Sequence, residues 1–535
     1  MTWSSQSLSD QGHWDALRNL ISRGQKLPAL DSLLQKLKAS NAKFYIVEDF
    51  YLDRDYSAEY ISFYAKLFKI TEKICKRIHF FSKDLADLKN KGPVDIIATL
   101  EECSRLGEYL GFTVVRPVTH APLGRTVIRT HDNPPAATTQ QLVSSAFDVH
   151  LLGATLEVVG FPFIQQDQRI TACAQAAIWA TARHFHARHR GQWVSAPEIN
   201  SAAQNPLDEV LSQSLPSGSG GITVRNMVRA LNYIGLRPIV YARKINLTNN
   251  TLYWPPTLTP AHIVDRYIDS GLPVILILTP WAKDQESNHA VVASGRVITV
   301  RDPATLHHPY ATRSELIDCL IVNDDQRGVD VRLPVTKGST YGETPYNVEH
   351  IGGIVIPLPD KVYMKAEQAE AISWGLLEEW RQLYSIIEAE LKSRNISKSA
   401  LDHIAMFKNA ADNNEVLART YLTFGWRYKQ RILKNHCSET IKNAIYDQEF
   451  PRLVWVTEFG RTNDLNLLDD KKAVIASHIV TDATALPGPF VSQTIHLPGV
   501  LQRAIHDRAR PSNDYQTETF WVVDDRPYGI KIRGT

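Results

Sequence analysis

The chain has 535 residues, more than one hydrophobic core accommodates, so several domains are expected. Hydrophobic residues make up 44% and charged residues 22%, a composition typical of globular proteins that excludes wholesale disorder. With 59 basic and 57 acidic side chains the net charge is +2, which gives no overall attraction to nucleic acid or to an anionic membrane.

The first 150 residues are expected to form an α/β region of unknown role. Leucines recur at helical spacing up to residue 37, a run at 44–47 is typical of a strand, and a further apolar run lies at 109–117. The first residues show neither the basic cap nor the apolar core of a secretory signal, and no stretch has the ~18 consecutive apolar residues of a membrane helix. We therefore expect a cytoplasmic protein without a membrane span.

Residues 151–345 are expected to form a compact α+β domain. Short β-branched runs alternate there with helical patterns, and a Gly-rich loop lies at 217–221. A strand at 352–357 is expected to close this central part. Residues 346–535 are expected to form a C-terminal helical and β region of unknown role, led by a long amphipathic helix over about 363–392.

The most informative stretch surrounds Cys173. Polar, glutamine-rich residues at 165–168 give way to an alanine-rich helical pattern, and the cysteine stands in its first turn. Unpaired N–H groups and the helix dipole favour a thiolate at that position, and the thiolate is the nucleophilic form. The other cysteines are widely spaced and form no CxxC pair, which argues against a disulfide framework and a structural zinc site.

A histidine that can accept the thiol proton is expected at the start of an apolar strand, in Asn288-His289-Ala290-Val291-Val292. Thirteen residues later stands Asp302, followed by Pro303. A hairpin that turns at Gly295-Arg296 would return the chain to its starting level, so that Asp302 would lie beside His289 and hold its ring.

This order of residues resembles the papain-like cysteine peptidases that cleave double-glycine leader peptides, together with their bacterial relatives. The resemblance covers about residues 155–310 and implies an N-terminal helix packed on an antiparallel sheet. It also implies that Cys173 is the nucleophile, His289 the general base and Asp302 its orienting residue. The glutamine that completes the oxyanion hole in that family corresponds to Gln166, with Gln168 as the alternative. The flanking regions match no family.

The sequence thus predicts a cysteine hydrolase, a thiol protease that cleaves a peptide or isopeptide bond in a protein or peptide substrate through an acyl-thioester. Two alternatives remain open. Deamidation or acyl transfer uses the same three side chains, and an inactive papain-like module would bind a peptide tail without cutting it. The Ala174-Gln175 pair favours the inactive module, because the family usually has Cys-Gly-Pro or Cys-Gly-Ala at this place.

No cofactor or metal is expected. His184, His186 and His189 form an HxHxxH pattern, but residues two apart on a helix point to different sides, and neighbouring arginines favour a solvated polar face. The Gly-rich loop lacks the Lys-Ser/Thr of a phosphate-binding loop. No nucleic-acid partner is expected either.

Overall fold

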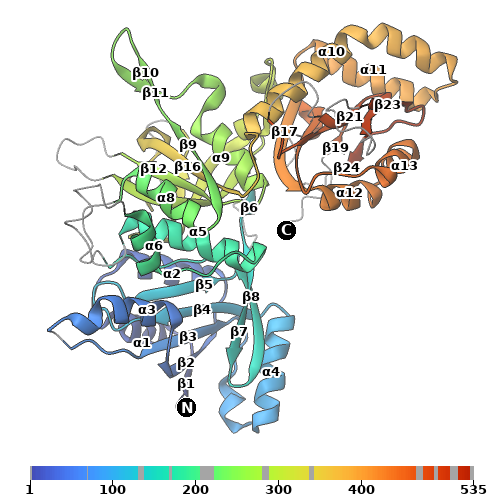
Figure 1. The fold of residues 1–535 in the computed structure, drawn as a ribbon. Helices are drawn as coiled ribbons and strands as arrows, with labels where there is room; N and C mark the ends of the chain where they lie inside the picture. Colours follow the sequence, from blue (N-terminus) through green and yellow to red (C-terminus); the bar gives the residue numbers. More distant parts are fainter. Residues whose placement is uncertain are drawn as a thin grey trace.

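A computed structural model describes residues 3–68, 70–130, 138–167, 172–204, 222–279, 288–336, 343–465, 474–486, 492–505 and 516–529. In these ranges helices and antiparallel sheets build three successive sheet-centred units, seen in Figure 1 from blue through green to red. The chain is therefore a mixed α and β protein. Among the described helices, none is long and apolar enough to cross a membrane.

The first unit is a five-stranded antiparallel meander in the order β1-β2-β3-β4-β5. Its strands are β1 (Trp3–Ser7), β2 (Phe44–Tyr51), β3 (Cys75–Phe81), β4 (Tyr109–Val115) and β5 (Leu123–Ile128). Its helices are α1 (Gln11–Ser22), α2 (Pro28–Ala39), α3 (Arg54–Ser62) and α4 (Pro93–Arg105).

Side chains alternate between the two faces of this sheet, and apolar side chains lie on both faces. Tyr45 and Val47 pack with the leucines of α1 and α2, whereas Phe44 and Ile46 pack with α3, α4 and the hairpin of β7 (Ser145–Leu151) and β8 (Ala154–Gly160). The N-terminal unit therefore has two cores, one on each side of its sheet.

The second unit is an antiparallel sheet in the order β15-β14-β13-β12-β16-β9, with β6 paired to β13. Its strands are β6 (Thr138–Leu142), β9 (Leu236–Ala242), β12 (Val274–Leu278), β13 (His289–Thr299), β14 (Ile317–Asp324), β15 (Gly328–Pro334) and β16 (Ile351–Pro359). Its helices are α5 (Cys173–His189), α6 (Ala196–Ala203), α8 (Val224–Tyr233) and α9 (Pro260–Asp269), and a small hairpin joins β10 (Lys244–Asn246) to β11 (Thr251–Tyr253). Because β6 and β16 belong to it, this sheet takes strands from outside the predicted range 151–345.

Helix α5 joins the central sheet to the first unit. Its alanines and Trp179 are buried in the same core as the apolar side chains of β13. On the side of α3, Trp179 Nε1 donates to Asp55 Oδ1 at 3.0 Å, and Arg183 pairs with the same carboxylate. This buried pairing fixes the helix on which Cys173 stands.

The third unit contains a six-stranded antiparallel sheet in the order β17-β18-β20-β21-β22-β23. Its strands are β17 (Val416–Phe424), β18 (Leu453–Arg461), β20 (Ser477–Asp482), β21 (Ser492–Leu497), β22 (Val500–Ile505) and β23 (Gln516–Trp521), with a separate pair of β19 (Val474–Ile475) and β24 (Tyr528–Gly529). Its helices are α10 (Ala366–Ser393), α11 (Lys398–Asp412), α12 (Gly425–Leu433), α13 (Glu439–Asp447) and α14 (Thr462–Leu465). The long helix predicted at about 363–392 is confirmed as α10.

A buried ionic cluster links the central and C-terminal units. Arg296 on β13 lies 2.8 Å from Asp265 and 2.7 Å from Asp269, and Arg419 on β17 lies 2.7 Å from Asp269. These side chains are nearly inaccessible to solvent. Removing one member would leave a partner charged and buried, which is strongly destabilising, so the cluster ties the two units together.

Candidate active site

Cys173 is the first residue of α5, as the sequence predicts. The preceding residue, Ala172, has an extended backbone (φ −95°, ψ 177°), so the chain enters the helix directly at the cysteine. The thiol therefore lies among the N–H groups of the first turn, which have no partner within the helix. Cys173 is half-buried, whereas the other four cysteines are buried, and burial raises the pKa of each of those four thiols.

His289 is the first residue of β13, which confirms the predicted strand start. It pairs across the sheet with Leu278, the last residue of β12, so it stands at one end of both strands. The Sγ atom of Cys173 lies 4.0 Å from the carbonyl oxygen of Asn288, the residue before the histidine, and the Cys173 side chain contributes to raising the pKa of His289. The structure therefore brings Cys173 and His289 together.

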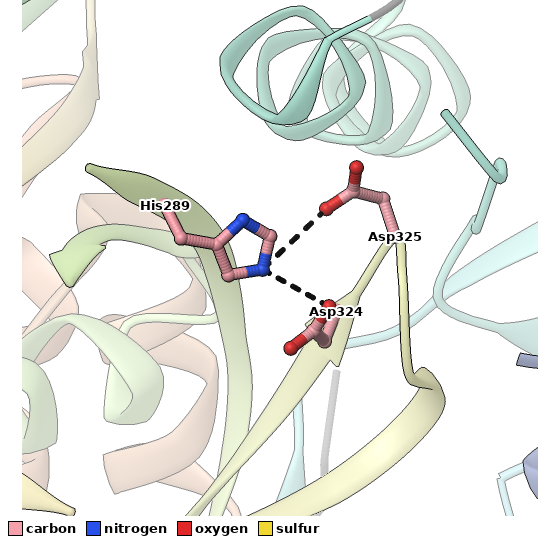
Figure 2. Close-up of side chains that lie close together, drawn as sticks. All are labelled: His289, Asp324 and Asp325. Carbon is pink, nitrogen blue, oxygen red and sulfur yellow. Dashed lines mark hydrogen bonds and ion pairs between the residues drawn. The ribbon is translucent and has the colours of Figure 1, made fainter. Parts of the chain in front are cut away.

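Two aspartates from the next strand lie on the other side of the imidazole. β14 runs antiparallel to β13 and ends at Asp324, which brings the end of β14 beside the start of β13. His289 Nε2 lies 3.0 Å from Asp324 Oδ1 and 3.8 Å from Asp325 Oδ1 (Figure 2). Because Nε2 faces the carboxylates, Nδ1 is the ring nitrogen left for the thiol.

Asp324 is itself held in place by the turn that follows β14. Its Oδ1 accepts hydrogen bonds from the backbone N–H groups of Gln326 at 2.9 Å and Arg327 at 3.1 Å. The carboxylate is 2% exposed, and Arg327 Nε lies 4.0 Å from its second oxygen. A carboxylate fixed in this way sets the orientation of the imidazole and supports its charged form.

Asp302 does not orient His289, so this prediction is wrong. β13 runs without a turn from His289 to Thr299, and ten residue steps of a strand span roughly 33 Å. Asp302 therefore lies beyond the far end of the strand. It is exposed, and its carboxylate accepts a hydrogen bond from Ala304 N at 3.0 Å as the cap of a short 3₁₀ turn.

The structure describes only one of the two glutamines that are candidates for the oxyanion hole. Gln168 lies outside the described residues. Gln166 is half-buried beside Gln165, which is tied to the first unit through hydrogen bonds to Leu123. Among the hydrogen bonds of the described residues, none joins Gln166 to Cys173 or His289. Its role in an oxyanion hole stays a prediction.

The charges of the site favour a protonated imidazole. Burial works against a charge on His289, but the hydrogen bond to Asp324, the contact with Cys173 and the charges of both aspartates raise the pKa of His289 to about 11. Burial raises the pKa of Asp325 to about 7, opposed by His289 and reinforced by Asp324. Burial also acts to raise the pKa of Asp324, but its bonds to His289 and to the turn outweigh this, and the pKa is lowered. At neutral pH the imidazole beside the thiol is therefore protonated.

Tyr346 and Asp325 also belong to the site, and the sequence reasoning missed both. The centre of the Tyr346 ring lies 6.0 Å from that of the His289 ring, with 30° between the planes. The acidic pair Asp324-Asp325 directly follows a β-branched run, a pattern that marks a strand end followed by a turn. That signal could have identified the partner of His289, because it lies on the strand that follows β13 in the sheet.

The HxHxxH pattern on α5 is not the solvated face that was predicted. His184 is buried; its Nδ1 lies 2.7 Å from Ser145 Oγ and its Nε2 lies 3.1 Å from the carbonyl oxygen of Gly271. Arg183 is buried too, in the pair with Asp55. The pattern therefore serves packing between α5 and its neighbours, and only His186 is exposed.

Comparison of the sequence with protein-family models and with curated proteins finds no match. The function is therefore inferred from the side chains of the site alone. A thiol at a helix N-terminus, an imidazole in contact with it and a buried carboxylate on the second ring nitrogen can perform nucleophilic acyl chemistry.

Proposed function

We propose that the protein is a cysteine hydrolase that cleaves a peptide or isopeptide bond, with Cys173 as nucleophile, His289 as proton carrier and Asp324 as orienting residue. One observation carries the proposal: Cys173 Sγ lies 4.0 Å from the carbonyl oxygen of Asn288, and the imidazole of the next residue, His289, lies 3.0 Å from a buried carboxylate. This division of roles is the one that an activated cysteine requires.

In the proposed reaction the Cys173 thiolate attacks the carbonyl carbon of the substrate and forms a tetrahedral intermediate. The His289 imidazolium gives its Nδ1 proton to the leaving amine, the carbon–nitrogen bond breaks, and an acyl-thioester remains on Cys173. Neutral His289 then takes a proton from water, which attacks the thioester and releases the acid. The free N–H groups at the start of α5, with that of Cys173 itself, are suited to stabilise the oxyanion.

A papain-like arrangement of residues 151–345 is part of this proposal. The helix that begins with the cysteine packs against the antiparallel strand that begins with the histidine. These two features support the resemblance.

A burst experiment tests the acyl-transfer step without knowledge of the natural substrate. An activated ester such as p-nitrophenyl acetate, mixed with the full chain, should release one p-nitrophenolate per protein in a fast phase and add an acetyl group to Cys173. Cys173→Ala should remove the fast phase, and Cys319→Ala should keep it, because Cys319 is buried away from the site. A protein with no burst and no acetylated Cys173 would contradict the proposal and favour an inactive module.

Deamidation or acyl transfer would pass through the same thioester, so the burst does not separate these reactions from proteolysis. Product masses do: proteolysis yields two fragments, whereas deamidation leaves the substrate chain whole and changes its mass by about one unit.

A further inference from the structure

Asp325 is a buried carboxylate beside the imidazole of His289. It is 5% exposed, and among the described residues neither of its side-chain oxygens has a hydrogen-bond partner. Its nearest charged neighbour is His289, at 3.8 Å, and Figure 2 shows the carboxylate pointing at the ring nitrogen Nε2. A buried polar group without a partner is costly and calls for an explanation. The proton transfers of the proposed reaction do not use Asp325.

The three side chains around Nε2 are arranged like metal ligands. One donor atom from each of His289, Asp324 and Asp325 can be chosen so that all three lie within 4.8 Å of one another. Two ligands of a tetrahedral zinc ion, with bonds of about 2.1 Å, are separated by about 3.4 Å. The observed separations of 3.0 Å and 3.8 Å from Nε2 lie on either side of this value. Small side-chain movements would therefore suffice to enclose an ion.

The side chains also supply negative charge for a cation once Nε2 of His289 has lost its proton. Two buried carboxylates face a single imidazole, and the further positive group is Arg327, 4.0 Å from Asp324 and partly exposed. A cavity of about 10 Å³ borders Asp325 and Ala177, which is close to the smallest volume that holds one water molecule. Imidazole and carboxylate oxygens together suit zinc and similar transition metals.

We propose that His289, Asp324 and Asp325 form a binding site for a divalent transition metal ion of the zinc type. The metal forms a bond to Nε2 of His289 and displaces the proton of Nε2 to solvent. The imidazole keeps its hydrogen on Nδ1, and the two aspartates bind the ion in place of the displaced proton.

The competing ligand is the Cys173 thiolate, because zinc also binds sulfur well. The test therefore uses the full chain with Cys173→Ala, which lacks the thiol and retains all three proposed ligands. Zinc binding to this protein is measured by titration calorimetry. Binding is then compared between Cys173→Ala/Asp325→Asn and the matched control Cys173→Ala/Asp302→Asn, in which an exposed aspartate outside the site is changed.

The expected result is saturable binding of one zinc ion per chain to the Cys173→Ala protein. Asp325→Asn should weaken it by at least about tenfold, the smallest loss typical even for outer partners of metal ligands, and Asp302→Asn should leave it unchanged. If circular dichroism shows that the Asp325→Asn protein does not fold, Asp324→Asn takes its place in the comparison. Binding that disappears with the thiol, or that is the same in the Asp325→Asn and Asp302→Asn proteins, would overturn the site. Because no activity is read, this outcome is separate from a failure of the burst experiment.

Discussion

Changing Asp324 to asparagine isolates the electrostatic contribution of this residue to the candidate site. The substitution keeps the shape of the side chain but removes the negative charge 3.0 Å from His289 Nε2. Burial lowers the pKa of an imidazole, so the raised pKa of His289 depends on its acidic partners. Asp302→Asn is the matched control, because that carboxylate is exposed and caps a separate turn.

The size of the effect follows from the energy of the bond. A hydrogen bond to a charged group contributes about 1.5–3 kcal/mol, and one pKa unit corresponds to 1.36 kcal/mol. We therefore expect the pKa of His289 to fall from about 11 by roughly one to two units or more in Asp324→Asn. In Asp302→Asn it should stay within a few tenths of the wild-type value.

The measurement is an NMR titration of protein labelled with ¹⁵N in its histidine rings, with the His289 signal assigned by its loss in His289→Gln. The imidazolium form of His289 should persist above pH 9 in the wild type and in Asp302→Asn, and should be lost at a lower pH in Asp324→Asn. An Asp324→Asn protein in which His289 titrates as in the wild type would refute the assigned role of Asp324. A change of equal size in Asp302→Asn would refute the finding that Asp302 lies away from His289.

Two further predictions concern stability. Burial raises the pKa of Asp325 to about 7, whereas an aspartate in the unfolded chain has a pKa near 4. Between pH 4 and 7 the folded protein therefore keeps a proton that the unfolded chain loses. Because of this carboxylate, the free energy of unfolding falls as the pH rises through that range. Thermal melts should therefore show that the stability of Asp325→Asn relative to wild type increases across that range; a difference independent of pH would contradict the burial argument. Arg296→Met should lower the free energy of unfolding by about 3–5 kcal/mol, because Asp265 and Asp269 lose a buried partner. Urea unfolding of the cooperative unit that contains Arg296 measures this loss. A loss below about 1 kcal/mol would show that the cluster is not coupled to folding.

The local features of the site could be predicted from the sequence. The change from glutamine-rich to alanine-rich residues marks the start of α5 at Cys173, and the apolar run after Asn288 marks the start of β13. Both depend on neighbouring residues in the chain, which is where periodicity and capping are informative. The long amphipathic helix α10 was predictable for the same reason.

The course of β13 could not be predicted, and Gly295-Arg296 explains why. The glycine indicates a turn, but its lack of a side chain serves close packing with β6: a Cβ atom at Gly295 would lie 2.6 Å from the carbonyl oxygen of Gln141. The arginine indicates an exposed residue, but it is buried against Asp265 and Asp269. Both residues are explained by partners distant in sequence, so the local pattern favoured a hairpin where the strand continues.

The partner of His289 depends on strand register, which a single sequence specifies only weakly. Val292 pairs with Asn323, and this register brings Asp324 next to the imidazole. Asp302 is nearer in sequence but lies beyond the opposite end of β13. Cys173 and His289 were therefore found from local signals, whereas the carboxylate beside the imidazole required the sheet.

The central claim is that His289 activates Cys173, and the rate of alkylation of this thiol at low pH tests it most directly. At pH 6 a free cysteine, with an ordinary pKa of about 8.5, is less than about 1% thiolate, so its reaction with iodoacetamide is slow. Peptide mapping after short exposure at pH 6 should show Cys173 modified at least about tenfold faster than free cysteine, with the rate reduced to that of free cysteine in His289→Ala. A wild-type Cys173 that reacts no faster than free cysteine, or at the same rate with and without His289, would contradict the claim.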